Sequence, residues 1–394
     1  MKAVMLAAGI GKRCYPLTLT RPKPLLKILN KTIVEHNLEQ FGNIFDELII
    51  VIGYKGEMIQ KHIGQKYLGV KIKYVEQLEQ AGTGHALLQT KEHLKGNFIV
   101  FGGDDIFFKQ DVKDLIKNKS PSIMCHDREW PENFGVVVEE KTVLKEIVEK
   151  PDKFISNKVN TGMYLLSDSI FSILENIEKS SRGEYEITDS INKLAEKEQV
   201  KVVRADKWIP IGYPWHILDA NKLFLEAIKN DLNSKIEKNV TIKGNLVLGK
   251  GSVVKSGSYI EGPVIIGENS IIGPNSFIRP HTSIGNNCRI GLSEIKNSVI
   301  MDNFTSKHFA YIGESIMGEN VNIGAGTVIA DLRHDNSNVL SFYDETLVDT
   351  NRKKFGAVIG DGVKLGINTS VYPGRKIWPG KFTTPGEIVK SDLL

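Results

Sequence analysis

Hydrophobic and polar positions follow two different patterns along the chain, and the change falls near residue 230. In residues 1–225, short apolar runs typical of strands alternate with amphipathic segments of helical spacing. This alternation predicts an α/β domain with a mainly parallel sheet. The segments, in chain order, are Val4–Leu6, Ile33–Phe41, Leu48–Val51, Glu57–Ile63, Ile72–Val75 and Phe98–Phe101. Such sheets bind ligands beyond the carboxyl ends of their strands, so we expect the site in the loops after Leu6, Val75 and Phe101.

After about residue 235, branched apolar residues recur every six positions, and glycine follows most of them. A fixed period of six predicts a parallel β-helix, in which each side of a triangular coil is one short strand. The branched residue points inward, and glycine or asparagine forms the tight corner. The series comprises Ile266, Ile272, Ile278, Ile284 and Ile290, then Met317 and Ile323, then Ile359, Leu365, Val371 and Ile377.

Two segments stand outside these patterns. Residues 218–232 have helical spacing, and we expect a linker helix there that ends the first domain. The expected domains are therefore residues 1–232 and residues 233–394. Between Ala330 and Gly356 the six-residue period stops in a polar, charged stretch. A long loop that leaves a solenoid is usually functional or disordered.

Composition narrows the class of protein. A net charge of +4 over 394 residues gives no argument for a nucleic-acid or membrane partner. The three cysteines, Cys14, Cys125 and Cys288, form no CxxC pair, which suits a reducing compartment and argues against a cysteine zinc site. No apolar run is long enough to span a bilayer. We therefore expect a soluble, cytoplasmic protein.

The loop after the first strand, Leu6 to Arg13, reads LAAGIGKR. Its glycines let backbone N–H groups approach phosphate oxygens, and Arg13 adds a cation. A dinucleotide-binding loop would have a third glycine at Cys14 and an acidic residue near Lys31, and both are missing. Further on, prolines on both sides of Lys23 restrict the backbone and can hold a second cation toward the same phosphates.

This region resembles the sugar-1-phosphate nucleotidylyltransferases, whose signature is LAAGxGxR followed by a PKP-type lysine. The resemblance implies a Rossmann-like nucleotidyltransferase domain in which Arg13 and Lys23 grip the triphosphate as catalytic residues. It also implies that the nucleotide is lined by backbone of the same loop, at Leu6, Ala8, Gly9 and Gly11.

The segment EQLEQAGTGHA, residues 76–86, resembles the uracil-reading loop of N-acetylglucosamine-1-phosphate uridylyltransferases. In that resemblance Gln77, Gln80, Gly82 and Thr83 contact the base, and UTP is the nucleotide. Amide side chains offer both donors and acceptors, which suits a pyrimidine edge.

The segment GGDD, residues 102–105, follows an apolar strand and resembles the family's metal-binding GD motif. The resemblance assigns Asp104 as the Mg2+ ligand, since a carboxylate plus phosphate oxygens is the usual environment of this ion. Asp105 is expected to serve a turn or a helix cap. The family's second metal ligand is an aspartate in W-x-D-x-G, where this chain has Pro210, so the second ligand is left open.

Downstream residues match the family's sugar side in order and spacing. The resemblance implies that Lys150 binds the phosphate of the sugar 1-phosphate. It also implies that the sugar hydroxyls are bound by Gly135, Glu149, Asn160 and Thr161. The segment EYEITD, residues 184–189, belongs to the same pattern.

The β-helical half resembles the acetyltransferase site of the bifunctional glucosamine-1-phosphate acetyltransferase/uridylyltransferases, and this implies a left-handed coil. The match lies in SKHFAYIG, residues 306–313, and NVNIGAGT, residues 320–327. By resemblance His308 is the general base toward acetyl-CoA and the amino sugar, a duty that imidazole can perform near neutral pH. The substrate contacts implied are Arg279, Lys296, Tyr311, Asn322 and Asp331.

Two positions of this second site depart from the family. Asp331 stands where the family has asparagine, and Ser337 stands where it has a CoA-side lysine. Either the nearby Arg333, Arg352, Lys353 and Lys354 take over CoA binding, or acetyl transfer is weak or altered in substrate.

The resemblance covers nearly the whole chain and implies an archaeal-type bifunctional enzyme of UDP-N-acetylglucosamine synthesis, with glucose 1-phosphate as a further substrate. It also implies a homotrimer, because neighbouring coils usually share each acetyl-transfer site. Two alternatives stay open at this point. One is a single-function nucleotidylyltransferase with a structural, trimerising β-helix. The other is a non-catalytic, nucleotide-sugar-sensing subunit that lost a metal ligand at Pro210.

Overall fold

The computed structural model describes residues 1–42, 44–118, 121–232 and 234–394, and the chain divides into two compact units. The first unit comprises residues 1–10, 22–25 and 33–210. The second unit comprises residues 11–21, 26–32 and 211–394. The chain thus passes between the units more than once near its N-terminus, and each unit is described below by itself.

A ten-stranded sheet forms the first unit, in the order β10-β11-β13-β9-β12-β7-β1-β4-β6-β5. Its centre consists of parallel strands β7 (Asn97–Gly102), β1 (Lys2–Ala7), β4 (Glu47–Ile52) and β6 (Val70–Glu76). The chain steps from β1 to β4 and β6 on one side and places β7 on the other side. The strand order therefore reverses beside β1, and such a switch point is where open α/β sheets bind ligands.

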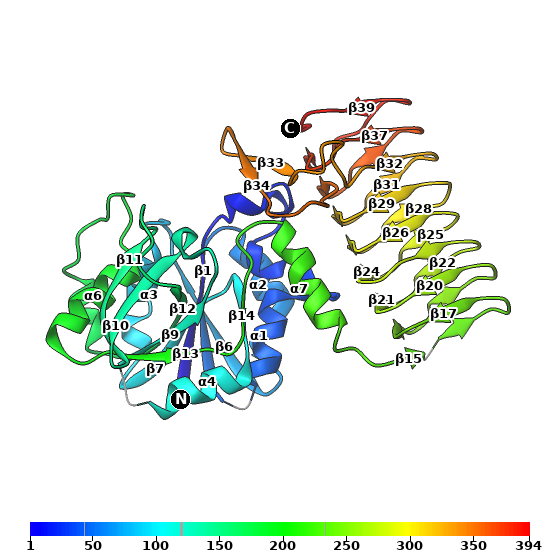
Figure 1. Cartoon of the computed structure of the whole chain (residues 1–394). Coiled ribbons are helices and arrows are strands. Elements are labelled where there is room, and N and C mark those ends of the chain that lie inside the picture. Colours follow the sequence, from blue (N-terminus) through cyan, green and yellow to red (C-terminus); the bar gives the residue numbers. More distant parts are fainter. Residues whose placement is uncertain (43, 119–120, 233) are drawn as a thin grey trace. The chain divides into compact units, whose positions relative to one another are not determined.

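The remaining elements of the first unit complete this sheet and cover its two faces (Figure 1). The other strands are β5 (Lys66–Tyr67), β9 (Ser122–Asp127), β10 (Gly135–Glu140), β11 (Val143–Glu149), β12 (Lys158–Ser167) and β13 (Lys201–Arg204). A separate pair joins β8 (Asp105–Phe107) to β14 (Trp208–Pro210). The helices are α1 (Ile33–Phe41), α2 (Gly56–Ile63), α3 (Thr83–Leu88), α4 (Lys109–Lys117), α5 (Ile170–Leu174) and α6 (Ile187–Lys197).

The side chains of the central strands point alternately to the two faces of the sheet, and this explains why the unit has two hydrophobic cores. Ala3 and Met5 of β1 pack with α1, α2 and α4, whereas Val4 packs with α3, α5 and α6. Successive side chains of a strand point to opposite faces, so a strand covered on both faces is apolar throughout. The six strands and helices expected from the sequence are all confirmed.

The second unit carries a parallel β-helix with three faces, which appear as stacked coils in Figure 1. The first face contains β15 (Asp231–Leu232), β18 (Leu246–Leu248), β21 (Val264–Ile266), β24 (Thr282–Ile284), β27 (Val299–Ile300), β30 (Ile316–Met317), β35 (Val358–Ile359) and β38 (Lys376–Ile377). The second face contains β16 (Lys235–Ile236), β19 (Val253–Val254), β22 (Ile271–Ile272), β25 (Arg289–Ile290), β28 (Thr305–Ser306), β31 (Asn322–Ile323) and β36 (Lys364–Leu365). The third face contains β17 (Thr241–Lys243), β20 (Tyr259–Glu261), β23 (Phe277–Ile278), β26 (Glu294–Lys296), β29 (Tyr311–Gly313), β32 (Val328–Ile329), β37 (Ser370–Val371) and β39 (Ile388–Val389).

The six-residue pattern is confirmed in this β-helix. Residues Ile272, Ile278 and Ile284 occupy successive faces, and each is fully buried in one continuous core. Asparagines such as Asn269 (φ 54°) adopt the left-handed conformation at the corners. A side chain at Gly251, on the same corner of the preceding coil, would come within 2.4 Å of the Asn269 amide oxygen, so glycine is required there.

The linker helix differs from its sequence prediction. Helix α7 spans Trp215–Leu225, not residues 218–232, and it belongs to the second unit. It ends early because Asp231 and Leu232 form β15, which pairs with β18 in the first coil. The interruption of the β-helix is also ordered, as β33 (Leu340–Tyr343) and β34 (Thr346–Asp349) form an antiparallel hairpin.

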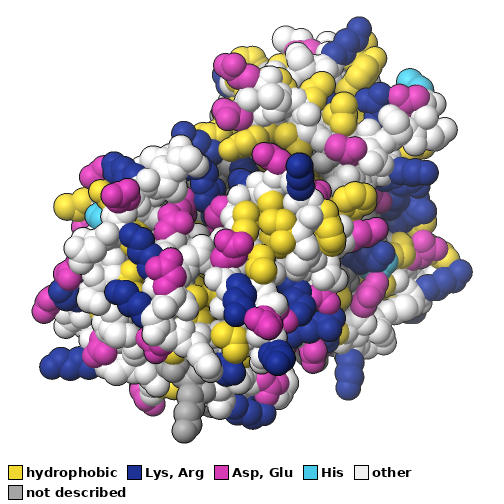
Figure 2. Space-filling view, turned by 60° about the vertical axis from the view of Figure 1, so that its left-hand side comes forward, with side chains coloured by type: hydrophobic (Ala, Val, Ile, Leu, Met, Phe, Trp, Pro, Cys, Tyr) yellow, Lys and Arg dark blue, Asp and Glu magenta, His cyan; other side chains and the backbone are white. Residues whose placement is uncertain are grey.

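None of the helices among the described residues combines the length and apolar composition that crossing a membrane requires. Charged side chains of both signs are intermixed over much of the face displayed in Figure 2.

Candidate active sites

Lys23 and Asp104 lie together at the carboxyl ends of β1 and β7 in the first unit. The Lys23 ammonium donates to the Asp104 carboxylate at 2.7 Å, and Lys23 is only 6% exposed. The Gly103 N–H donates to the Leu6 carbonyl at 2.9 Å, which ties the loop after β7 to the end of β1. A side chain at Gly102 would lie 2.9 Å from the Asp104 carboxylate. Lys23, predicted to hold the triphosphate, and Asp104, predicted to hold the metal, therefore meet at the switch point of the sheet.

Asp105 directly follows the turn at Gly103 and Asp104, and the next helix, α4, has Phe108 and not Asp105 as its N-cap. It begins β8, and its carboxylate accepts a hydrogen bond from the Trp208 indole at 3.1 Å. Pro210 stands opposite Asp105 in the register of β8 and β14. Asp105 thus joins two strands, and no local sequence signal indicates this because its partner lies about a hundred residues away.

The residues present fit a magnesium ion that is held by one protein carboxylate. Pro210 has no side-chain donor atom. Within the described part of the chain, no group of three or more His, Cys, Asp or Glu is arranged to hold a metal. Mg2+ is commonly bound through one or two carboxylates together with substrate phosphates. Asp104, whose side chain is 45% exposed, can supply that carboxylate.

Arg13 belongs to the second unit, so its approach to Lys23 and Asp104 stays a prediction. It lies in a short 3-10 helix, Lys12–Cys14, which begins after Gly11 in the left-handed conformation (φ 70°). The Gly11 carbonyl accepts from the Cys14 N–H and from the Thr18 hydroxyl, each at 2.9 Å. The Arg13 guanidinium lies over the ring of Tyr213, 5.6 Å from its centroid.

The loop predicted to read uracil connects β6 to α3 and is fixed by its own contacts. Gln77 is 3% exposed, and its amide lies 3.1 Å from the Gly82 carbonyl and 3.0 Å from His85 Nδ1. Gly82 has φ 110°, and a side chain there would lie 2.5 Å from the Tyr185 carbonyl. The Thr83 hydroxyl accepts from the Ile187 N–H at the start of α6. Gln80 is exposed.

The predicted sugar residues Gly135 and Glu149 face each other across β10 and β11. A side chain at Gly135 would lie 2.9 Å from the Glu149 carboxylate, so glycine leaves room for that carboxylate. Lys150 adopts a left-handed conformation (φ 44°), which is uncommon for a residue with a side chain. Its N–H donates to the Phe134 carbonyl at 3.1 Å, directly beside Gly135.

Two residues of this region, Arg182 and Tyr164, were not predicted. Arg182 lies 3.9 Å from Glu149 and donates to Glu186 at 2.7 Å. Burial raises the pKa of Glu186, while Arg182 acts in the opposite direction. Asn160 donates to the buried Tyr164 hydroxyl at 2.7 Å. The segment at residues 184–189 was recognised as part of the pattern, but side-chain partners across strands are not visible in a sequence.

Thr161 is placed differently from the other predicted sugar residues. It is 2% exposed, and its hydroxyl donates to the Met124 carbonyl at 3.0 Å. Its hydroxyl therefore holds β12 to β9.

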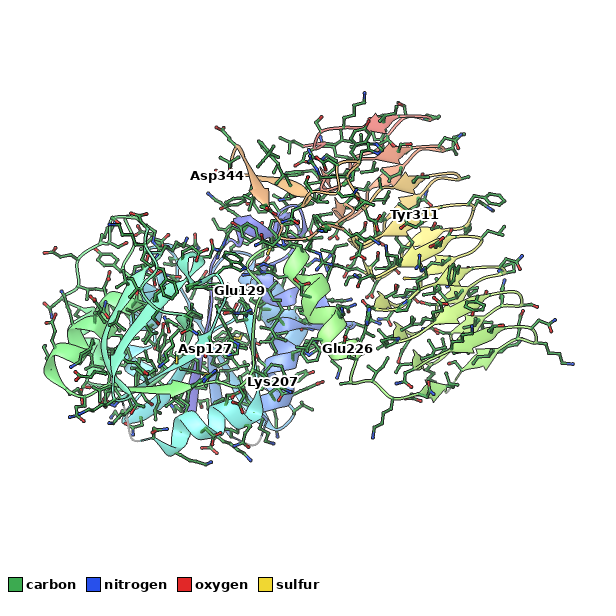
Figure 3. All side chains as sticks on the ribbon, in the orientation of Figure 1. Asp127, Glu129, Lys207, Glu226, Tyr311 and Asp344 are labelled. Atoms are coloured by element: carbon green, nitrogen blue, oxygen red, sulfur yellow. The ribbon has the colours of Figure 1, made fainter. Side chains whose placement is uncertain are left out.

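Four predicted acetyltransferase residues lie on strands of the third face of the β-helix or directly after them: Arg279, Lys296, Tyr311 and Asp331. Figure 3 labels Tyr311 on this face. The Asp331 carboxylate accepts from Lys296 at 2.8 Å and from the Tyr311 hydroxyl at 3.4 Å. Gly313 stands opposite Lys296, and a side chain there would lie 2.7 Å from both Tyr311 and Asp331. Arg279, one coil earlier, pairs with Glu294 at 3.0 Å.

The departure at Asp331 changes the charge around Lys296. Burial lowers the pKa of Lys296, but Asp331 and the buried Glu314 outweigh it, so its pKa is raised. Glu314 also pairs with Arg352 at 2.9 Å. The cation predicted to bind the sugar phosphate therefore has carboxylate partners, and an asparagine at position 331 would not provide this charge.

The second departure lies in the loop after β32. The Ser337 hydroxyl donates to Asp335 at 2.8 Å, and Arg333 pairs with the same carboxylate. Among the basic residues considered for CoA, Arg333 and Arg352 therefore have carboxylate partners.

His308 occupies the corner between the second and third faces, after β28 and before β29, and its side chain is exposed. Its carbonyl accepts from the Gly326 N–H of the next coil at 3.2 Å. Asn322, on β31, is exposed on the second face. The histidine thus lies three residues before Tyr311, at the corner where the third face begins.

The first unit is a nucleotidyl transferase domain, since a model of the Nucleotidyl transferase family matches residues 2–227. A model of the GMPPB C-terminal domain matches residues 260–382. A putative glucose-1-phosphate thymidylyltransferase from Bacillus anthracis, solved with a sucrose, has a TM-score of 0.54 and 26% identity. That similarity covers 59% of this chain and 97% of the other.

Two archaeal relatives match the whole chain. Bifunctional protein GlmU of Methanococcus maripaludis is 42% identical over 400 residues, which cover 100% of this chain and 95% of the relative. The bifunctional sugar-1-phosphate nucleotidylyltransferase/acetyltransferase of Sulfurisphaera tokodaii is 39% identical, with 100% and 98% covered. The chain belongs to this family of bifunctional enzymes. This confirms the sequence hypothesis that one chain combines the two activities.

Proposed function

We propose that the first activity transfers a uridylyl group from UTP to N-acetylglucosamine 1-phosphate and releases pyrophosphate. Glucose 1-phosphate is a further acceptor. The observation that carries the proposal is the Lys23–Asp104 pair at the switch point of the sheet. Gln77 and Gln80 read the base, and Gly135, Glu149 and Asn160 read the sugar, as the resemblance implies.

The reaction needs no enzyme-bound intermediate. An oxygen of the sugar phosphate, already anionic, attacks the α-phosphorus of UTP, the bond to the β-phosphate breaks, and pyrophosphate leaves. Lys23, Arg13 and Lys150 hold and neutralise the phosphates in line. Magnesium, held by Asp104 and the phosphates, supplies further neutralisation when bound.

The second activity transfers an acetyl group from acetyl-CoA to glucosamine 1-phosphate. The 2-amino nitrogen attacks the thioester carbonyl, a C–N bond forms, the C–S bond breaks, and CoA leaves as its thiolate, which then takes up a proton to give the thiol. His308 takes the proton that the amine loses. Lys296, Tyr311 and Asp331 support this assignment because they converge within 3.4 Å on the third face.

A panel of four nucleoside triphosphates crossed with several sugar 1-phosphates tests the first activity. We expect pyrophosphate release to be fastest with UTP and N-acetylglucosamine 1-phosphate. A preference for another base would show that the assignment of Gln77 and Gln80 to uracil is wrong. Absence of pyrophosphate with every pair would favour the sensing alternative.

We also propose a cytoplasmic homotrimer assembled through the β-helix. All three cysteines are free and buried, which suits a reducing compartment. Exposed apolar side chains, rare on monomer surfaces in groups, occur on the third face and at its corner with the second. They are Phe309, Val328, Ile367 and Ile388, between 43% and 71% exposed.

The predicted mass in light scattering is three times the 43.9 kDa of the chain. Burying these four side chains between the β-helices of neighbouring chains removes apolar surface from water, and this drives association. A mass of one chain at micromolar concentration would contradict the proposal.

A further inference from the structure

Arg13 rests on an aromatic group that includes a residue of the β-helix hairpin. Tyr213, beneath the guanidinium, stacks on Trp215 with ring centroids 4.5 Å apart and planes 6° apart. Tyr343, the last residue of β33, meets the Tyr213 ring edge-on at 5.8 Å. Phe355 meets Trp215 edge-on at the same distance. Tyr213, Trp215, Tyr343 and Phe355 are called the aromatic brace below. All four, like Arg13, belong to the second unit.

The hairpin that carries Tyr343 is anchored to the coil that contains β38. The Lys376 ammonium donates to the Phe342 carbonyl at 2.8 Å, and Arg375 donates to the Leu340 carbonyl at 3.1 Å. The Ser341 hydroxyl donates to the Gly374 carbonyl at 3.0 Å. Lys376 is 1% exposed, and burial lowers its pKa. A buried amine bonded to a backbone carbonyl fixes the hairpin, which therefore presents Tyr343 in one position; Figure 3 labels its neighbour Asp344 at the hairpin tip.

The Arg13 guanidinium lies over Tyr213 and also acts electrostatically on the Tyr343 phenol. Burial raises the pKa of the Tyr343 phenol, and the Arg13 guanidinium acts against this shift. Arginine has many rotamers in solution, and a planar guanidinium over an aromatic face loses much of that freedom. The brace therefore restricts Arg13 before any ligand binds.

We propose that Tyr343 is a positioning residue for nucleotidyl transfer, which holds Tyr213 against Arg13 and thereby orients the guanidinium for the triphosphate. This rests on the proposed role of Arg13 in the first activity. The loop that interrupts the β-helix thus contributes to the placement of Arg13. Small displacements of a charged group can lower the rate strongly, because transition-state stabilisation depends on its placement.

The test is a double-mutant cycle of Tyr343→Ala and Arg13→Lys, measured by pyrophosphate release. We expect Y343A to lower kcat by about 10–100-fold with a smaller change in the KM for UTP. Y343F, which keeps the ring, should retain most of the activity. In the R13K background, Y343A should cause little further loss, because its effect is transmitted through the guanidinium.

Phe382→Ala is the matched control, since it removes an exposed aromatic ring from the last coils and should leave kcat unchanged. Acetyl transfer by the same variants reports on folding of the β-helix and should be preserved in Y343A. Equal loss of both activities, or a full additional loss in the R13K background, would overturn the proposal. An R13K enzyme with wild-type kcat would instead refute the role of Arg13, and a wild-type chain that releases no pyrophosphate would refute the proposed function itself.

Discussion

Asp104→Asn will lower kcat for pyrophosphate release by about 10²–10³-fold, the loss typical of removing one group that stabilises developing charge. Asparagine keeps the size of the side chain and can still accept from Lys23, but it lacks the charge that binds Mg2+. The loss will be large because Pro210, opposite Asp105, offers no second carboxylate. The measurement is kcat as a function of magnesium concentration, and the concentration for half-maximal rate should rise.

Asp105→Asn is the matched control, since it makes the same chemical change one residue away. Asp105 accepts from the Trp208 indole, so this variant should unfold at a lower temperature and keep its kcat and magnesium dependence. If D105N shifted the magnesium dependence while D104N did not, the metal would be held by the other aspartate. Acetyl transfer should be unaffected in both variants.

The secondary structure was predictable because its signals are local. Strand β1 and helix α1 follow directly from short apolar runs, and the β-helix follows from a period of six that its closed coils impose. The end of α7 was not predictable, because β15 takes residues 231 and 232 into a coil whose other strands come later in the chain. The passage of residues 11–21 into the second unit likewise depends on distant contacts, such as that between Arg13 and Tyr213.

The same distinction applies to the sites. Residues in compact motifs, such as Lys23, Asp104 and Gly82, were found by their neighbours in sequence. Arg182 and Tyr343 were not predicted, since each contacts a partner on another element. The partnership of Asp331 was also invisible in the sequence. In the sequence motif, Asp331 stands where the family has asparagine. In the fold, its carboxylate accepts hydrogen bonds from Lys296 and Tyr311.

His308→Ala is expected to lower the rate of thiol release from acetyl-CoA with glucosamine 1-phosphate by about 10²–10⁴-fold, the usual contribution of a general base. The amine must lose a proton as it attacks, and no other side chain is proposed to accept it. The residual rate should rise with pH, because a larger fraction of the amino sugar is then already deprotonated. Nucleotidyl transfer, measured in the same preparation, should remain at the wild-type level.

His334→Ala is the matched control, because His334 is another exposed histidine, in the loop that interrupts the β-helix. Its removal should leave thiol release unchanged. The loss in H308A would then depend on the position of His308 and not on the loss of any exposed imidazole. Unchanged thiol release in H308A would show that the base is another group. A loss in H308A that glucosamine 1-phosphate at saturating concentration restores would show that His308 binds the acceptor and does not take its proton.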